Sequence, residues 1–384
     1  MKKAVCISIF NHYDNRVRFA EEFLRSHGYE VTYITSNYDH YTKDFYKLER
    51  ENCIQIDSRP YTKNISVQRL YSHYLSSKKT YDVLCEIKPD LIYVLAPPNS
   101  QVGICAKYRR RNKKTVLLVD IFDVWPETFP SLAGKIAFKP LFLIWRAVRD
   151  SGLPAADYII TECGLFRKKL ERQLSGRNSK ILHLCKASES YNQITSLSVS
   201  PLNICYLGAI NNIIDITAIE EILYGISLLK PIVLHIIGGG ENVDALCALE
   251  NHANISVRYY GMLYDEEEKH KIFDVCAFGL NIMKKSVCIG LTMKSVDYFE
   301  AGLPLINNIE SDTSWIVDRY GAGFNYNGNP SSFAEKICSC DEYMLLSMRY
   351  NTRKAFDEMF SQKIYNERFQ MLFDELELSA SQDV

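Results

Sequence analysis

Several short motifs that identify common enzyme classes are missing from this sequence of 384 residues. The first apolar run is followed by Asn11 to Asp14 rather than by a G-x-G-x-x-G turn, and no G-x-x-x-x-G-K-[ST] segment occurs. Dinucleotide oxidoreductases and P-loop enzymes are therefore disfavoured. There is also no D-x-D, the motif expected of metal-dependent sugar transferases of the single-domain type, and no zinc-binding H-E-x-x-H. We expect no cofactor and no metal.

Net charge and cysteine pattern exclude further classes. The formal net charge is -1, from 45 basic and 46 acidic residues, which argues against a general nucleic-acid binder. The 12 cysteines include no C-x-x-C pair, and Cys338 and Cys340 lack the second pair that a zinc site needs. The apolar run in MKKAVCISIF is short, lacks a cleavage site and predicts a buried strand rather than a secretory signal. These features favour a cytoplasmic protein.

Apolar runs alternate with helical patterns in two successive series, which predicts an α/β protein with two doubly wound domains facing a cleft. The predicted boundaries are residues 1–186 for the first domain, 187–201 for a serine-rich linker, 202–360 for the second domain and 361–384 for a helix that returns to the first. The predicted strands are 5–10, 31–35, 91–95, 116–119, 158–161 and 181–184, followed by 202–207, 232–237, 255–260, 277–281, 305–307 and 323–326.

The segment GLTMKSVDYFEAGLP, from Gly290 to Pro304, predicts a phosphate site. A glycine turn opens a helix there, and a helix start offers unpaired N–H groups and the positive end of a dipole. Lys294 and Asp297 are three residues apart, so we expect both on one helix face, reaching a phosphate and a sugar hydroxyl of one ligand. Glycine turns also follow earlier strands of the second series, at the sheet edge where ligands bind. They contain Gly208, Gly238, Gly239 and Gly261.

The order YLG, IIGGGE, YYGML and GLTMKSVDYFEAGLPLIN resembles the donor domain of GT-B glycosyltransferases, of the retaining family 4 type common in bacterial capsule and O-antigen polysaccharide synthesis. DIFDVWPE, residues 120–127, resembles the D-x-W-P-E segment of the acceptor domain in that group. The resemblance implies two Rossmann-like domains, a UDP- or GDP-linked sugar as donor and a growing, lipid-linked glycan as acceptor. It also implies a backbone cradle for the diphosphate at Gly290, Leu291 and Thr292, a phosphate contact for Lys294, a ribose contact for Asp297 and a base site near Met262 and Leu263. Gly208, Gly238 and Gly239 of the glycine turns would line the same donor site, and Lys284 could supply a further cation for the phosphates.

Two positions depart from that family pattern. The family often has two glutamates eight residues apart, where this chain has Ile289 and Asp297. Basic residues often follow the first glycine turn of the donor domain, where this chain has Asn211 and Asn212. Two alternatives to sugar transfer therefore stay open. One is a nucleotide-sugar epimerase of the same architecture, and the other is a non-catalytic partner that kept the fold.

Carboxylates after a buried strand of the first domain are the candidate catalytic groups. Asp120 and Asp123 lie there, and Asp123 could orient or deprotonate an acceptor hydroxyl, or could only cap the next helix. The loop after the first strand, with His12, Asn15 and Arg16, could reach the acceptor or the donor phosphates. Arg16 could supply a cation there, or it could be solvated in the first helix turn.

Residues 135–149 have the pattern of an interfacial amphipathic helix. The segment is too short to span a bilayer. Its apolar stripe either belongs to the core or docks on the inner membrane surface, where a peripheral enzyme would meet a lipid-linked acceptor. The candidate membrane contacts are Phe138, Phe142, Trp145 and Arg146.

Overall fold

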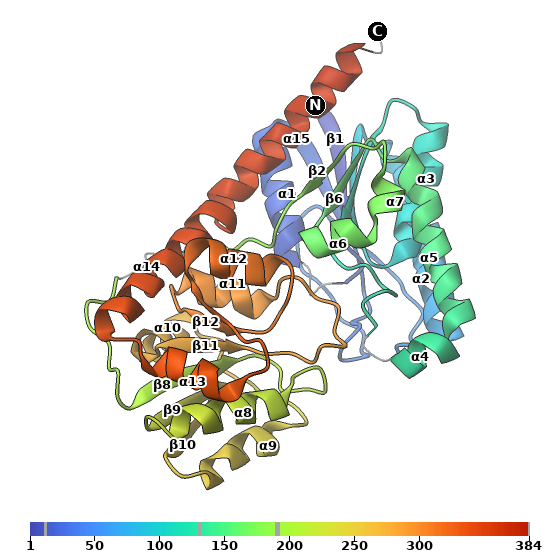
Figure 1. Cartoon of the computed structure of the whole chain (residues 1–384). Helices are drawn as coiled ribbons and strands as arrows, with labels where there is room; N and C mark the ends of the chain where they lie inside the picture. The colour runs from blue at the N-terminus through green and yellow to red at the C-terminus, as the bar shows by residue number, and fades with distance from the viewer. Residues whose placement is uncertain (11–13, 130–131, 189–192, 383–384) are drawn as a thin grey trace. The chain divides into compact units, whose positions relative to one another are not determined.

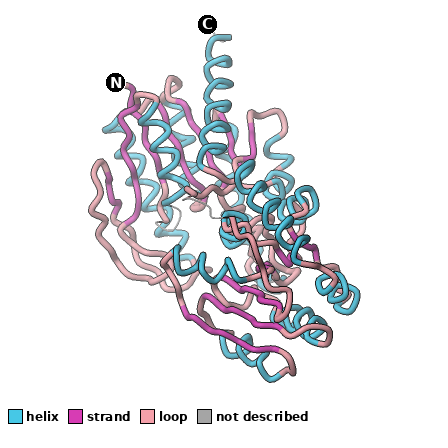
Figure 2. The backbone as a smooth tube through the Cα atoms, turned by 90° about the vertical axis from the view of Figure 1, so that its left-hand side faces the viewer, coloured by secondary structure: helices cyan, strands magenta, loops and turns pink. Residues whose placement is uncertain are grey.

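The computed structural model describes residues 1–10, 14–129, 132–188 and 193–382 (Figure 1). The chain forms two compact units. The first unit comprises Met1–His183 together with Asn366–Val384, and the second comprises Leu184–Tyr365. Each unit is built on one parallel sheet, whose strands run side by side in Figure 2.

The first unit contains a seven-stranded parallel sheet in the order β3-β2-β1-β4-β5-β6-β7. Its order reverses between β1 and β4, as in doubly wound folds. The strands are nearly continuous apolar runs because helices cover both faces of such a sheet. Their bounds are β1 Lys2–Ile7, β2 Tyr29–Ser36, β3 Cys53–Ile56, β4 Leu91–Ala96, β5 Val116–Ile121, β6 Tyr158–Thr161 and β7 Ser179–Ile181. The sequence prediction missed β3.

The helices of the first unit include α2, α3 and α5, which pack side by side (Figure 1). The predicted return of the C-terminal helix is confirmed, because the ring centroids of Phe369 on α15 and Phe23 on α1 are 4.8 Å apart. The bounds are α1 Asp14–Ser26, α2 Val67–Ile87, α3 Asn99–Arg111, α4 Leu132–Ala137, α5 Lys139–Gly152, η2 Leu153–Ala155, α6 Gly164–Lys169, α7 Glu171–Leu174 and α15 Gln362–Gln382.

The second unit contains a six-stranded parallel sheet in the order β10-β9-β8-β11-β12-β13. Its strands are β8 Leu202–Leu207, β9 Ile232–Ile237, β10 Ile255–Gly261, β11 Phe278–Asn281, β12 Leu305–Asn307 and β13 Gly323–Asn325. Its helices are α8 Ile216–Ser227, α9 Val243–Cys247, η3 Ala248–Asn251, α10 Glu266–Val275, α11 Met293–Glu300, α12 Asp312–Tyr320, α13 Pro330–Cys338 and α14 Glu342–Met359. The predicted doubly wound α/β class is confirmed for both units.

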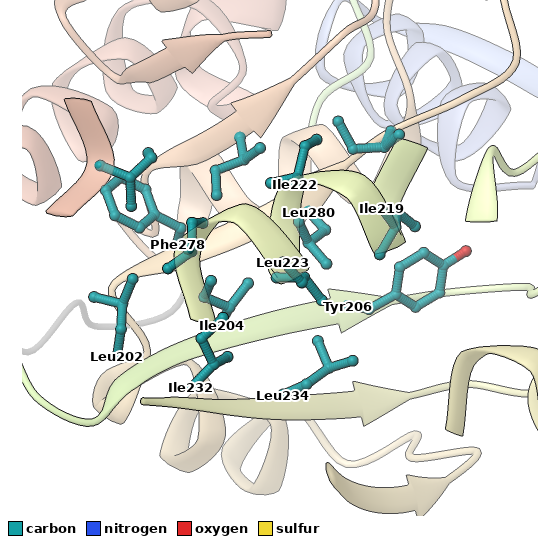
Figure 3. Close-up of a cluster of buried hydrophobic side chains, with 14 of the residues drawn as sticks. Leu202, Ile204, Tyr206, Ile219, Ile222, Leu223, Ile232, Leu234, Phe278 and Leu280 are labelled. Carbon is teal, nitrogen blue, oxygen red and sulfur yellow. The ribbon is translucent and has the colours of Figure 1, made fainter. Parts of the chain in front are cut away.

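The core of the second unit lies between its sheet and α8 (Figure 3). Ile222 and Leu223 of α8 are fully buried with Ile204 of β8. The hydroxyl of Tyr206 lies at the edge of this cluster and donates to the carbonyl of Ala209 at 2.9 Å. Leu197, from the stretch predicted as a linker, is also buried in this core.

The segment predicted as one amphipathic helix forms two helices, α4 and α5. Phe142 and Trp145 are only 6% and 3% exposed, and their rings lie 5.9 and 6.2 Å from that of Trp125. Of the two alternatives for this stripe, the core position therefore applies to Phe142 and Trp145, and neither is a membrane contact. Phe138 is partly exposed, and Arg146 pairs with Glu127 at 3.0 Å.

Apolar side chains do reach the surface here: Ile136, Leu143 and Ile144 are more than half exposed, and Phe138 is 41% exposed. They lie on the side of α4 and α5 that is turned away from the core residues. No helix in the described part of the chain is both long and apolar enough to cross a bilayer.

Candidate active site

The start of α11 is fixed by a short, well-bonded loop at the carboxyl edge of the second sheet. Thr292 caps the helix, its hydroxyl accepting from the N–H of Ser295 at 3.0 Å. The carbonyl of Gly290 accepts from both the N–H and the hydroxyl of Thr313, at 2.9 and 2.7 Å. Leu291 between them is buried. The remaining first-turn N–H groups stay available to an anion, as at any helix start.

Three asparagines, each ending a strand, form a ladder beneath this loop, in which Asn281 and Asn307 are buried and Asn325 is half-buried. Asn281 donates to Asn307 at 2.8 Å, and Asn307 donates to Asn325 at 2.8 Å. Asn281 also accepts from the Thr292 hydroxyl at 3.3 Å, which joins the ladder to the helix cap. The ladder therefore holds the start of α11 against β11, β12 and β13, and nothing in the sequence pattern singled it out.

The glycine turns bring the loops after β8 and β9 into direct backbone contact. A Cβ atom on Gly238 would lie 2.0 Å from the carbonyl oxygen of Gly208, and its φ of +140° disfavours any other residue. Gly239 has no such restriction, since its Cβ would only touch Met262 at 3.4 Å. Met262 is exposed beside this turn and Leu263 is half-buried, so these two predicted donor-binding residues lie at the same sheet edge.

The side chain of Lys294 runs into the protein rather than along the helix surface. Its Nζ lies 4.5 Å from the ring centroid of Tyr206, and among the described residues it has no hydrogen-bond partner. Burial lowers the pKa of this ammonium to about 7. Lys294 is therefore buried at the start of α11, and its role toward a phosphate stays a prediction. Helical spacing predicts that Lys294 and Asp297 lie about one turn apart, but it does not predict how deeply each side chain is buried.

Asp297 lies one turn later on α11 and is partly exposed. Its carboxylate pairs with Lys186, which the sequence analysis placed at the end of the first domain. Lys186 Nζ lies 2.9 Å from Asp297 Oδ1, 2.9 Å from Glu266 Oε2 and 3.6 Å from Glu300 Oε2. Lys284, the other predicted phosphate cation, is exposed in the loop after β11. Ile289, in place of the family's first glutamate, packs partly buried against the core.

Arg16 and Asp120 form a buried ion pair in the first unit. The guanidinium donates to both carboxylate oxygens at 2.7 and 3.0 Å, and to the carbonyls of Leu182 and His183 at 2.7 and 3.1 Å. The hydroxyl of Tyr93 also donates to Asp120. Arg16 is thus neither solvated nor directed at a ligand, and both expectations for it are corrected. Asp120 likewise stabilises the fold, because both of its carboxylate oxygens accept hydrogen bonds from these donors.

Asp123 remains the candidate catalytic carboxylate. It is half-buried and accepts from the hydroxyl of Thr128 at 2.7 Å. Burial raises its pKa, which moves it toward the range useful to a general base. The capping alternative is wrong, because the next helix begins only at Leu132. Asn15 is exposed in α1, and His12 lies outside the described residues.

Side chains that the sequence did not single out surround the Asp123 turn. The guanidinium of Arg69 lies 5.4 Å from the ring centroid of Trp125. Asn99 donates to the carbonyls of Trp125 and Trp145, both at 2.9 Å. These contacts fix the turn that carries Asp123. They could not be read from spacing because they join α2, α3, α5 and the loop after β5.

No protein-family model and no curated protein sequence matches this chain. Solved structures do match. A sucrose-phosphate synthase from Thermosynechococcus elongatus has a TM-score of 0.69 at 12% identity, covering 99% of this chain and 100% of its own. HepE from Anabaena, solved with UDP and glucose, has a TM-score of 0.65 at 12% identity, covering 98% and 100%. The lipopolysaccharide outer core galactosyltransferase WaaB has a TM-score of 0.64 at 14% identity, covering 98% and 100%. With two doubly wound units and full-length similarity to these enzymes, the chain has the GT-B glycosyltransferase fold.

Proposed function

We propose that this protein transfers a sugar from a nucleoside-diphosphate donor, UDP- or GDP-linked, to a growing, lipid-linked cell-surface glycan such as a capsule or O-antigen polysaccharide. Transfer proceeds without a metal and with retention of anomeric configuration, as in family 4 enzymes. The observation that carries the proposal is the arrangement on α11. A capped helix start, a buried ammonium without a hydrogen-bond partner among the described residues, and a half-buried carboxylate follow one another within one and a half turns.

Each part of this arrangement matches one part of a nucleoside diphosphate. The first-turn N–H groups of α11 suit a phosphate, and the Lys294 ammonium would gain the anion that it lacks in the protein. Asp297 suits the hydroxyls of the ribose, because a carboxylate accepts two or more hydrogen bonds. The similarity to HepE, solved with UDP and glucose, and to the galactosyltransferase WaaB supports this proposal.

A donor panel tests the function. We expect nucleotide release from one UDP- or GDP-sugar only when a lipid-linked acceptor is present, and we expect Asp297→Ala to weaken nucleotide binding at least about tenfold, the loss of a charged hydrogen bond. Nucleotide release is followed by coupled absorbance and binding by calorimetry.

The control for Asp297→Ala is Glu267→Ala on the exposed side of α10, which should bind as the wild type does. Sugar isomerisation without release would favour an epimerase. The absence of any nucleotide binding would favour a non-catalytic partner. Wild-type affinity in Asp297→Ala would remove the donor site proposed here.

A lipid-linked acceptor places the enzyme at the inner membrane surface, and we propose that α4 and α5 make this contact. Ile136, Phe138, Leu143 and Ile144 are exposed apolar residues there. Lys139 and Arg146 are exposed next to them and suit anionic headgroups. The contact therefore uses residues other than the buried Phe142 and Trp145.

Vesicle co-sedimentation tests the membrane contact. Replacing Leu143 and Ile144 with serine should reduce binding to phosphatidylglycerol-containing vesicles at least about tenfold. Two apolar side chains that become buried in the membrane surface contribute a few kcal/mol to binding, about the energy of this change. The matched control replaces Leu228 and Leu229, equally exposed at the end of α8 in the second unit, and should bind as the wild type does. Equal binding by both double variants would contradict the proposal.

A further inference from the structure

Asp297 is bonded on one side only. Its Oδ1 atom accepts from Lys186 Nζ at 2.9 Å, and its side chain is 23% exposed. Within the described parts of the chain, no other side chain forms a hydrogen bond or an ion pair with this carboxylate. One oxygen is therefore fixed by the protein while the other is left to accept from a ligand.

Lys186 is itself fixed by its main chain and by its neighbours. Its N–H donates to the carbonyl of Phe360 at 3.0 Å, and it forms a parallel bridge with Ser361, where α14 ends. Its ammonium lies among the carboxylates of Asp297, Glu266 and Glu300. Burial acts to lower the pKa of Lys186, but these three anions outweigh it and raise the pKa well above the ordinary value.

Further cations hold the carboxylates that share Lys186. Glu300 accepts from His270 Nε2 at 3.0 Å, and Arg353 lies 3.7 Å from it. Glu266 also pairs with Lys269. Among the described residues, the ammonium of Lys186 joins this network to Asp297, and the network connects α10, α11 and α14.

We propose that Lys186 is the positioning residue for ribose recognition: it holds Asp297 with one oxygen directed to the 2′- and 3′-hydroxyls of the donor nucleotide. The inference rests on the proposed function, because it assigns the ribose to Asp297. Without the ammonium, Asp297 would lie beside Glu266 with no cation between them, and repulsion would turn its carboxylate away from the ligand. In this role the ammonium of Lys186 acts through Asp297 and does not need to contact the phosphates of the donor.

The test compares UDP, or GDP if the donor panel selects it, with the matching 2′,3′-dideoxynucleotide. We expect the wild type to prefer the ribonucleotide at least about tenfold, the loss expected when a site built for hydroxyls meets a ligand without them. Lys186→Met should reduce this ratio to below about twofold, as should Asp297→Asn, and Lys186→Arg should recover part of it. If Lys186→Met does not fold, Lys186→Gln serves in its place. The control is Lys269→Met, which removes a cation from Glu266 but none from Asp297 and should keep the wild-type ratio.

The ratio of ribonucleotide to dideoxynucleotide affinity distinguishes an error in the role of Lys186 from an error in the assignment of ribose to Asp297. A ratio kept by Lys186→Met but lost by Asp297→Asn would overturn the role of Lys186 and leave the ribose at Asp297. A ratio kept by both variants would overturn the positioning role together with the assignment of ribose to Asp297. A wild type that binds no nucleoside diphosphate would overturn both the proposed function and this inference.

Discussion

Lys294→Met is expected to stabilise the protein while it impairs donor binding. The ammonium of Lys294 is buried over Tyr206 and has no hydrogen-bond partner in the part of the chain that the structure describes, an arrangement that costs free energy until an anion is bound. Methionine has a similar length and no charge. We expect the free energy of unfolding at pH 7 to rise by about 2 kcal/mol or more, and the affinity for the nucleoside diphosphate to fall at least about tenfold.

The stabilisation by Lys294→Met should depend on pH in a defined direction. Burial lowers the pKa of Lys294 in the folded protein to about 7, from 10.5. Between these values the unfolded chain binds the extra proton, so the stability of the wild type rises with pH over this window. The difference between Lys294→Met and the wild type should accordingly be largest below pH 7 and shrink toward pH 10. Urea denaturation at several pH values measures it.

The control for this comparison is Lys271→Met, which removes an exposed lysine from α10. It should change neither the stability nor the nucleotide affinity by a measurable amount. A Lys294→Met variant with wild-type stability would contradict the buried position of the ammonium. Wild-type nucleotide affinity in the same variant would contradict its role in the donor site.

Asp120→Ala is expected to destabilise the protein by about 3–5 kcal/mol, since it leaves the buried guanidinium of Arg16 without its anion. Arg16→Met should cost a similar amount by leaving Asp120 unpaired. The double variant should lose less than the sum of the two, because no unpaired charge then remains. Thermal and urea denaturation of all four proteins give the coupling between the two side chains.

Asp123→Asn is the matched comparison at the end of the same strand. This carboxyl is half-buried with one side-chain partner, Thr128, so its change should alter stability by less than about 1 kcal/mol. If Asp123 is the catalytic carboxylate, turnover should fall without loss of stability. Full stability combined with lost turnover in Asp120→Ala would return the catalytic role to Asp120 and contradict the structural assignment.

The sequence predicts an element correctly where the signal for it lies within a few neighbouring residues. The bounds of β6, Tyr158–Thr161, and of β12, Leu305–Asn307, agree with the prediction because each is a short apolar run between polar turns. Strand β3 was missed because Cys53–Ile56 is a four-residue edge strand that contains a glutamine and shows no clear period. The helix start at Thr292 was likewise predictable from a glycine turn followed by a capping residue.

The contacts that shape the site were not predictable in this way. Lys186 and Asp297 are 111 residues apart, and Arg16 and Asp120 are 104 apart, so only the folded chain brings each pair together. Periodicity also left two alternatives open for α5. Phe142 and Trp145 follow the spacing of an interfacial helix, but a helix packed on an apolar core has the same spacing, and only burial separates the two cases.

The hydrogen bond between the Lys186 N–H and the Phe360 carbonyl has a consequence for evolution as well as for chemistry. It fastens together the two places where the chain enters and leaves the second unit, Leu184–Tyr365. A unit whose two ends lie together is one continuous segment of the chain, and recombination can exchange such a segment for another of the same kind.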